Sequence, residues 1–381
     1  MEFVLSLLVG LGVLSFLVLI HEAGHFVVAR AFGVKVEEFG IGFPFLGRIF
    51  KFKRNGVVYS VNWLLFGGFV QLYGEEAGSA KGPESFSSKN VWVRFTIAIA
   101  GILVNIVLAI ILFTILLASS NFKVDFQSPI ENKFPFGTET KFVMVSGVSE
   151  NSPAEKAGMK FGDKILSVDA NEIAGVKQIQ EYVKDHRGEP VTFQIENINE
   201  KSSREVIAIP RVDPPEGQGA LGIGLDEGQT LSYNSVPERV FVGVLHSINM
   251  IDFQIAGLQS FLSQSVKEKS IEPLASQASG PVRIVAVLGV LVRDSGSEVV
   301  KVVVTFTALI SLMLGIGNLL PIPALDGGRL FFFLIEGITG KKVKPKIENM
   351  IHGVGFAVLL LLIFVITAND IFRIFTGQLF G

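Results

Sequence analysis

Four long runs of hydrophobic residues, none containing Asp, Glu, Lys or Arg, stand out in the sequence. They cover residues 3–20, 95–118, 302–320 and 351–368. A helix of about 20 apolar residues spans a bilayer, so each run predicts a transmembrane helix. For the first run the alternative is a cleaved signal peptide. It is disfavoured because no basic residue precedes the run and no small-residue cleavage site follows it.

The segments between these hydrophobic runs predict other secondary-structure elements. Residues 48–53 and 57–61 read as a β-hairpin, because Asn55-Gly56 between them is a strong turn signal. Residues 142–212 read as a small α+β domain with short strands and a helix started by Ser152-Pro153. Residues 235–265 are semi-apolar and predict either an amphipathic helix at the membrane interface or a buried helix.

Composition supports the membrane interpretation over four buried core helices of a soluble protein. Hydrophobic residues make up 49% of the chain and charged residues 18%, whereas soluble domains carry about 25% charged residues. The net charge of -2 gives no indication of nucleic-acid binding. Basic residues gather in the loop 31–93 and between the third and fourth runs, which places both loops in the cytoplasm and residues 142–212 outside.

The expected fold is therefore that of an α-helical membrane protein with four transmembrane helices. A membrane-associated β-hairpin region and an inserted α+β domain complete it. The predicted segments are residues 1–30, 94–119, 300–330 and 350–369 for the helices, 31–93 for the cytoplasmic loop with the hairpin, 142–212 for the inserted domain, and 235–265 for the amphipathic helix.

The first hydrophobic run continues directly into the motif HEAGH at residues 21–25. On a helix, His21 and His25 share a face and can bind one zinc ion, with Glu22 close enough to act as general base. The alternative is a set of interfacial polar residues where the helix leaves the membrane. Ionisable residues at this depth are costly and usually functional, which favours the metal site.

A catalytic zinc ion usually has three protein ligands and one water. The chain has no cysteine and only three further histidines, His186, His246 and His352. Asp326 is the better candidate, because it follows the third hydrophobic run on the same predicted membrane side as His21 and His25. Alone it would read as a turn or cap residue.

These motifs resemble the site-2 protease family of intramembrane zinc metalloproteases, peptidase family M50, in its bacterial RseP-like branch. The resemblance covers nearly the whole chain. It rests on residues 21–25 (HEAGH), 318–329 (NLLPIPALDGGR), 40–44 (GIGFP), 67–70 (GGFV) and 280–282 (GPV). Residues 151–158 and 162–166 of the inserted domain resemble a bacterial PDZ domain, of which the chain has one rather than a tandem pair.

The resemblance implies that His21, His25 and Asp326 bind Zn2+ and that Glu22 is the catalytic base. It implies cleavage of single-span membrane proteins, such as anti-sigma factors or remnant signal peptides, within their transmembrane segments. Substrate would bind along the hairpin edge near Gly67 and Gly68 and to Asn318, although a helix C-cap is the other interpretation of Asn318.

The implied location is the bacterial inner membrane, in contact with lipid. The active site would lie near the cytoplasmic side and the PDZ domain outside the cytoplasm. That domain would either bind a peptide or act as a steric filter. Two other functions are a non-enzymatic scaffold, which normally lacks a ligand or the Glu, and a metal transporter, which requires more ionisable residues within the spans.

Overall fold

The computed structural model describes residues 2–75, 82–127, 132–173, 175–197, 203–215, 217–270, 280–294 and 296–376. The chain divides into two compact units, and each is described by itself. The first unit comprises residues 1–116 and 258–381, and the second comprises residues 117–257.

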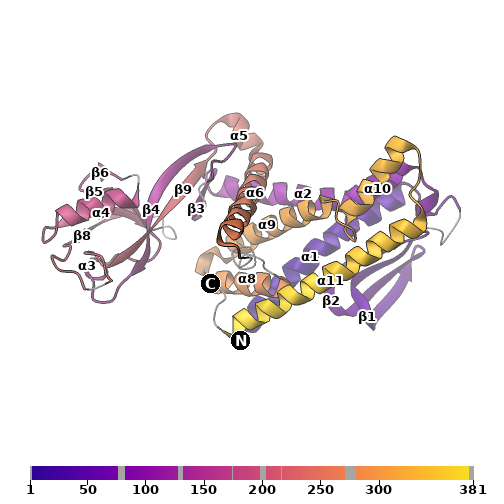
Figure 1. Ribbon diagram of the computed structural model, residues 1–381, viewed down its shortest axis with the longest axis horizontal. Coiled ribbons are helices and arrows are strands. Elements are labelled where there is room, and N and C mark those ends of the chain that lie inside the picture. The colour runs from indigo at the N-terminus through magenta and orange to yellow at the C-terminus, as the bar shows by residue number, and fades with distance from the viewer. Residues whose placement is uncertain are drawn as a thin grey trace. The chain divides into compact units, whose positions relative to one another are not determined.

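The first unit is mainly helical (Figure 1). Its helices are α1 (Glu2–Ala31), α2 (Val91–Ser119), α8 (Pro281–Asp294), α9 (Val299–Leu319), α10 (Asp326–Thr339) and α11 (Pro345–Phe375). Four segments of α1, α2, α9 and α11 are long and apolar enough to cross a bilayer, namely Leu8–Ala31, Val91–Ser119, Val299–Leu319 and Lys346–Ile374. These four helices coincide with the four predicted hydrophobic runs.

Small residues let the helices of this unit approach closely. A Cβ on Gly24 of α1 would lie 2.8 Å from the Ala100 carbonyl oxygen of α2. A Cβ on Gly315 of α9 would lie 2.7 Å from the Ile106 side chain of α2. The Ser311 hydroxyl of α9 donates to the backbone oxygen of α2 at Asn105, 2.8 Å away. Such contacts are typical of helix packing in membranes, where burial of apolar surface gives no preference for protein over lipid.

A sheet formed by β1 (Val36–Arg54) and β2 (Val57–Leu72) belongs to the same unit. The predicted turn is confirmed, since Asn55 (φ 51°) and Gly56 (φ 83°) both have the positive φ of a type I′ hairpin. Residues 38–41 pair on one side with 58–61 and on the other with 68–71. The segment 68–71 is therefore an outer strand of this sheet, and β2 also packs against α1.

The second unit contains a seven-stranded antiparallel sheet in the order β3-β9-β4-β5-β7-β8, with β6 paired to β5. The strands are β3 (Lys123–Gln127), β4 (Thr138–Val148), β5 (Asp163–Val168), β6 (Asn171–Glu172), β7 (Val191–Asn197), β8 (Ser203–Ala208) and β9 (Ile223–Ser232), accompanied by the helices α3 (Pro153–Lys156) and α4 (Val176–Asp185). Alternate residues of β7 (Val191, Phe193 and Ile195) are fully buried in its core. Strands β5 to β8 lie within the predicted residues 142–212, whereas β3 and β9 of the same sheet lie outside them. Ser152 caps α3 by accepting from the Glu155 N–H.

Residues 235–265 are helical, in α5 (Val236–Val240) and α6 (Val242–Glu268). Within the second unit, the polar residues of α6 face protein. His246 and Asn249 are buried against Tyr233, whereas Val244 and Ile248 are exposed. The helix therefore has a buried side that carries polar residues and an exposed side that carries apolar ones, and its location at a membrane interface remains a prediction.

Candidate metal centre

The two histidines of the HEAGH motif converge because one turn of α1 separates them. Their Nε2 atoms are 3.2 Å apart, and the rings of His21 and His25 meet edge to face with centroids 4.8 Å apart. Both side chains are buried. The predicted pairing of these residues on one helix face is therefore present.

Asp326 reaches the same point from a distant part of the chain. Helix α9 ends at Leu319, the loop contains Pro321 and Pro323, and α10 begins at Asp326. The Asp326 Oδ2 lies 2.9 Å from Nε2 of His21 and 3.2 Å from Nε2 of His25. Around a tetrahedral zinc ion with bonds of about 2.0–2.1 Å, ligand atoms lie about 3.3 Å apart. The three atoms thus have nearly the spacing that zinc requires.

The other ring nitrogens of the two histidines face hydrogen-bonding groups of α2. Nδ1 of His25 donates to the Ile97 carbonyl oxygen at 2.8 Å, which leaves Nε2 for a metal. The Asn105 amide lies 3.5 Å from Nδ1 of His21, and its Oδ1 is buried without a partner among the described residues. Turning the Asn105 amide would let Oδ1 accept from Nδ1 of His21.

Gly101 of α2 leaves the space in which these ligand atoms sit. A Cβ at this position would lie 2.4 Å from Nε2 of His25 and 2.9 Å from Nε2 of His21. Real Cβ atoms do not make such contacts, so any side chain here would displace the rings. Glycine is required here by proximity to the centre rather than by its backbone angles.

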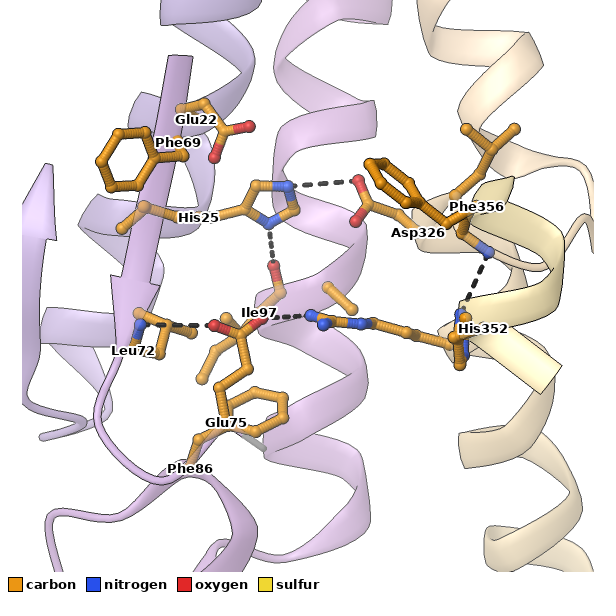
Figure 2. A pocket seen from close by; sticks show the side chains of 16 residues that line it. Glu22, His25, Phe69, Leu72, Glu75, Phe86, Ile97, Asp326, His352 and Phe356 are labelled. Atoms are coloured by element: carbon orange, nitrogen blue, oxygen red, sulfur yellow. Dashed lines mark hydrogen bonds and ion pairs between the residues drawn. The ribbon is translucent and has the colours of Figure 1, made fainter. Parts of the chain in front are cut away.

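A cavity of about 460 Å³ opens beside this centre (Figure 2). Its lining includes Glu22, His25 and Asp326. In Figure 2, Glu22 lies on one side of the cavity and His352 on the other, with Asp326 between His25 and His352. The predicted catalytic base, Glu22, and two of the three predicted ligands, His25 and Asp326, therefore line the same cavity.

Charged side chains other than the predicted base and ligands also line the cavity. Nearby, Arg329 forms an ion pair with Glu75, whose second oxygen accepts from the Leu72 N–H at 3.3 Å. Arg329 and Glu75 thus satisfy each other's charge in the wall of the cavity.

The residues predicted to bind substrate lie at different places. Gly68 is close to the centre, since a Cβ there would lie 3.6 Å from Cγ of Glu22 and 3.1 Å from the Gly40 oxygen. Gly67, with φ 78°, directly precedes the outer strand 68–71. Asn318 is half-buried in the last turn of α9 and does not line the cavity. No contact in the structure tests its predicted role.

Three residues of this region have no role in the sequence-based prediction, namely Gly101, Asn105 and His352. Asn105 and His352 interrupt hydrophobic runs with polar groups, and that signal could have identified them. Gly101 gives no comparable signal, because glycine is common in transmembrane helices for packing reasons.

Comparison with known proteins places the chain among metallopeptidases. The family model described as Peptidase family M50 matches residues 9–362. A Clostridium acetobutylicum protein, named provisionally as a zinc metalloprotease, is 32% identical over 355 residues, covering 93% of this chain and 94% of that protein. Zinc metalloprotease RasP of Shouchella clausii is 30% identical over 453 residues, covering 97% of this chain and 100% of the relative.

A second RasP, from Geobacillus kaustophilus, is 27% identical and covers 98% of this chain and 99% of its own length. The family match, residues 9–362, includes the positions of the three converging side chains, and the centre has the donor set and spacing of a zinc site. The four helices that are long and apolar enough to cross a bilayer are consistent with a membrane protein. The chain therefore belongs to peptidase family M50 and is a membrane-embedded zinc metalloprotease.

Proposed function

We propose that this protein is an intramembrane protease of the site-2 type, which hydrolyses peptide bonds within the transmembrane segments of single-span membrane proteins. The supporting observation is the convergence of His21, His25 and Asp326 beside Glu22 and a cavity. His21, Glu22 and His25 lie in a helix long and apolar enough to span a membrane. A soluble protease would have no reason to place its charged centre there.

In this proposal, His21, His25 and Asp326 hold the zinc ion through Nε2, Nε2 and Oδ2. When bound, zinc supplies Lewis-acid catalysis, which polarises the peptide carbonyl and acidifies a water molecule. Glu22 accepts a proton from the water that attacks the carbonyl carbon. It then gives that proton to the departing amide nitrogen. Asn105 and the Ile97 carbonyl fix the orientation of the histidine rings.

The outer strand 68–71 is proposed as the place where the substrate extends. A transmembrane helix must unwind before its peptide bonds can be cut, and its freed backbone groups need partners within the membrane. An edge strand offers such partners. Gly68 lies at Glu22, so a segment paired to this edge would pass close to the base. Gly67 and Asn318 are assigned to substrate binding as part of the same proposal.

The proposed topology places the protein in a bacterial inner membrane with the centre near the cytoplasm. The second unit has an antiparallel sheet, two short helices and its own apolar core, and this architecture supports a PDZ-like domain at residues 142–212 on the other side. Such a domain would bind a peptide or screen substrates by size. The substrates would be anti-sigma factors, remnant signal peptides or similar single-span proteins.

The first experiment captures substrates with a catalytically impaired variant. Glu22→Gln in the native membrane should bind substrates without releasing them, and mass spectrometry would identify the proteins retained. In proteoliposomes, wild type should then cut a retained protein within its span, whereas Glu22→Gln should be slower by about a hundredfold to ten-thousandfold. Glu84→Gln, at an exposed position, is the matched control. Unchanged cleavage by zinc-loaded Glu22→Gln would refute the assignment.

A further inference from the structure

The loop between α9 and α10, residues 320–325, determines where Asp326 lies. Its backbone turns twice, with the Ile322 N–H donating to the Leu320 oxygen at 2.7 Å and the Leu325 N–H to the Ile322 oxygen at 3.2 Å. Ala324 has φ 80°, in the left-handed region that residues other than glycine rarely adopt. A residue held in this conformation needs support from its surroundings.

Glycines of two helices hold the loop from both sides. A Cβ on Gly328 of α10 would lie 2.6 Å from the Ile322 oxygen. A Cβ on Gly355 of α11 would lie 2.4 Å from Cβ of Pro323. The loop is therefore enclosed between α10 and α11, with the Ala324 peptide facing α11.

His352 of α11 makes the polar contact with this loop. The Ala324 N–H donates to Nδ1 of His352 at 3.0 Å (Figure 2). The ring also packs edge to face on Phe332 of α10, with centroids 5.6 Å apart. Because Nδ1 accepts a hydrogen bond, the neutral ring carries its proton on Nε2.

We propose that His352 is a positioning residue that orients Asp326 for zinc by fixing the Ala324 peptide. The proposal rests on the proposed function, in which Asp326 is a zinc ligand. Ala324 is two residues before Asp326, so a rotation of its peptide is carried directly into the start of α10. Without the Nδ1 acceptor, Ala324 would relax toward negative φ and the carboxylate would leave the point where it meets His21 and His25. The fourth apolar helix, α11, thereby helps to determine the metal affinity of a centre built by α1 and α10.

Asn and Leu at position 352 form a matched pair for the test. The two side chains have the same branched shape and number of heavy atoms, but only Asn keeps an acceptor near the place of Nδ1. Full-length protein in detergent micelles would be titrated with zinc against a chromophoric chelator. His352→Leu should raise the zinc dissociation constant about tenfold or more, the effect typical of lost outer-shell contacts. His352→Asn should stay within about threefold of wild type.

A second measurement does not depend on zinc. In the zinc-free protein, deuterium exchange at the Ala324 amide should be faster in His352→Leu than in His352→Asn or wild type. Equal zinc affinity and equal exchange in the Leu and Asn variants would overturn the proposal. If His352→Leu does not fold, His352→Gln replaces it. Its amide lies near the place of Nε2, so it should weaken zinc binding as Leu would, and affinity equal to that of Asn would again overturn the proposal.

Asp326→Ala separates this inference from the function on which it rests. If Asp326→Ala binds zinc as tightly as wild type, the proposed ligand set is wrong. If Asp326→Ala loses zinc while His352→Leu keeps it, the ligand set stands and only the role of His352 is wrong. Phe364→Leu, at an exposed position of α11, should leave the zinc affinity unchanged.

Discussion

Each unit of the protein buries histidine, but with different partners. In the first unit, His21 and His25 meet a carboxylate, Asp326, next to a cavity. In the second unit, His246 meets the neutral hydroxyl of Tyr233, whose oxygen lies 3.0 Å from Nδ1. Burial is similar, with 7% of His21 and 4% of His246 exposed. The two regions therefore differ in what surrounds the ring rather than in how deeply it lies.

The comparison shows what distinguishes a metal centre from a structural polar cluster. Around His246, Asn249 donates to the Tyr233 hydroxyl at 2.9 Å and to the Phe136 oxygen at 2.8 Å, while its own oxygen accepts from the Phe136 N–H at 3.1 Å. These polar groups join α6 to the segment that follows β9 and to the loop before β4. At the metal centre, by contrast, three ligand atoms point at one another, an arrangement that a metal ion would stabilise.

The largest expected effect comes from removing a histidine from each region. His25→Ala should weaken zinc binding by roughly a hundredfold or more and abolish proteolysis, because one of three ligands is lost. His246→Ala should leave zinc affinity unchanged but destabilise the second unit by about 2 to 4 kcal/mol, since a buried side chain is removed. Zinc titration and hydrogen exchange of each full-length variant would measure both quantities. A loss of zinc binding in His246→Ala would contradict the assignment of His246 to a structural cluster rather than to the metal centre.

The pH dependence of the second unit should be the next largest effect. Burial lowers the pKa of His246 to about 4, whereas the unfolded chain titrates near 6.5, at about the reference value. As the pH falls, the unfolded state takes up this proton first. The contribution to stability is complete above pH ~6.5 and is lost as the pH falls toward ~4, by about 3 kcal/mol in all.

Hydrogen exchange of α6 amides in the second unit, corrected for intrinsic rates, would follow this loss between pH 4.5 and 7. His246→Asn keeps a hydrogen-bonding group near Nδ1 but does not titrate in this range. The pH slope should therefore disappear in that variant, and its persistence would mean that other groups cause it.

Adding a methyl group beside the metal centre should have an intermediate effect. Gly101→Ala would place a Cβ 2.4 Å from Nε2 of His25. The rings must move, which should cost about 1 to 3 kcal/mol of zinc binding free energy, or roughly tenfold to a hundredfold in affinity. Gly12→Ala, in the open space beside α1, is the matched control. Equal zinc affinity in the two variants would show that Gly101 does not shape the centre.

The smallest effect is expected at the histidine that belongs to neither buried cluster. His186 lies partly exposed at the end of α4 and stacks on Tyr182, with ring centroids 4.2 Å apart. His186→Ala should change the stability of the second unit by no more than about 0.5 kcal/mol, as is usual for surface positions. Zinc affinity should not change. A clear loss of zinc would place His186 unexpectedly among the ligands.

Much of the fold could be predicted because its signals are local. Hydrophobic length predicts the four long helices, because a chain in lipid must satisfy its backbone internally. The Asn55-Gly56 turn and the alternation in β7 are equally local. The orientation of α6 was less predictable, since its polar residues could face water or protein. Their burial depends on Tyr233 and Phe136, which lie outside the helix.

For the site, the sequence by itself determined that His21, Glu22 and His25 share a helix at the end of a hydrophobic run. The absence of cysteine also limited the third ligand to a histidine or a carboxylate. Only the tertiary structure decided that Asp326, 305 residues away from His21, reaches the pair rather than His186, His246 or His352. It also decided which residues leave room for the ligands and orient them. The physical reason is that helix periodicity acts over a few residues, whereas the meeting of α1 with α10 depends on packing along the whole chain.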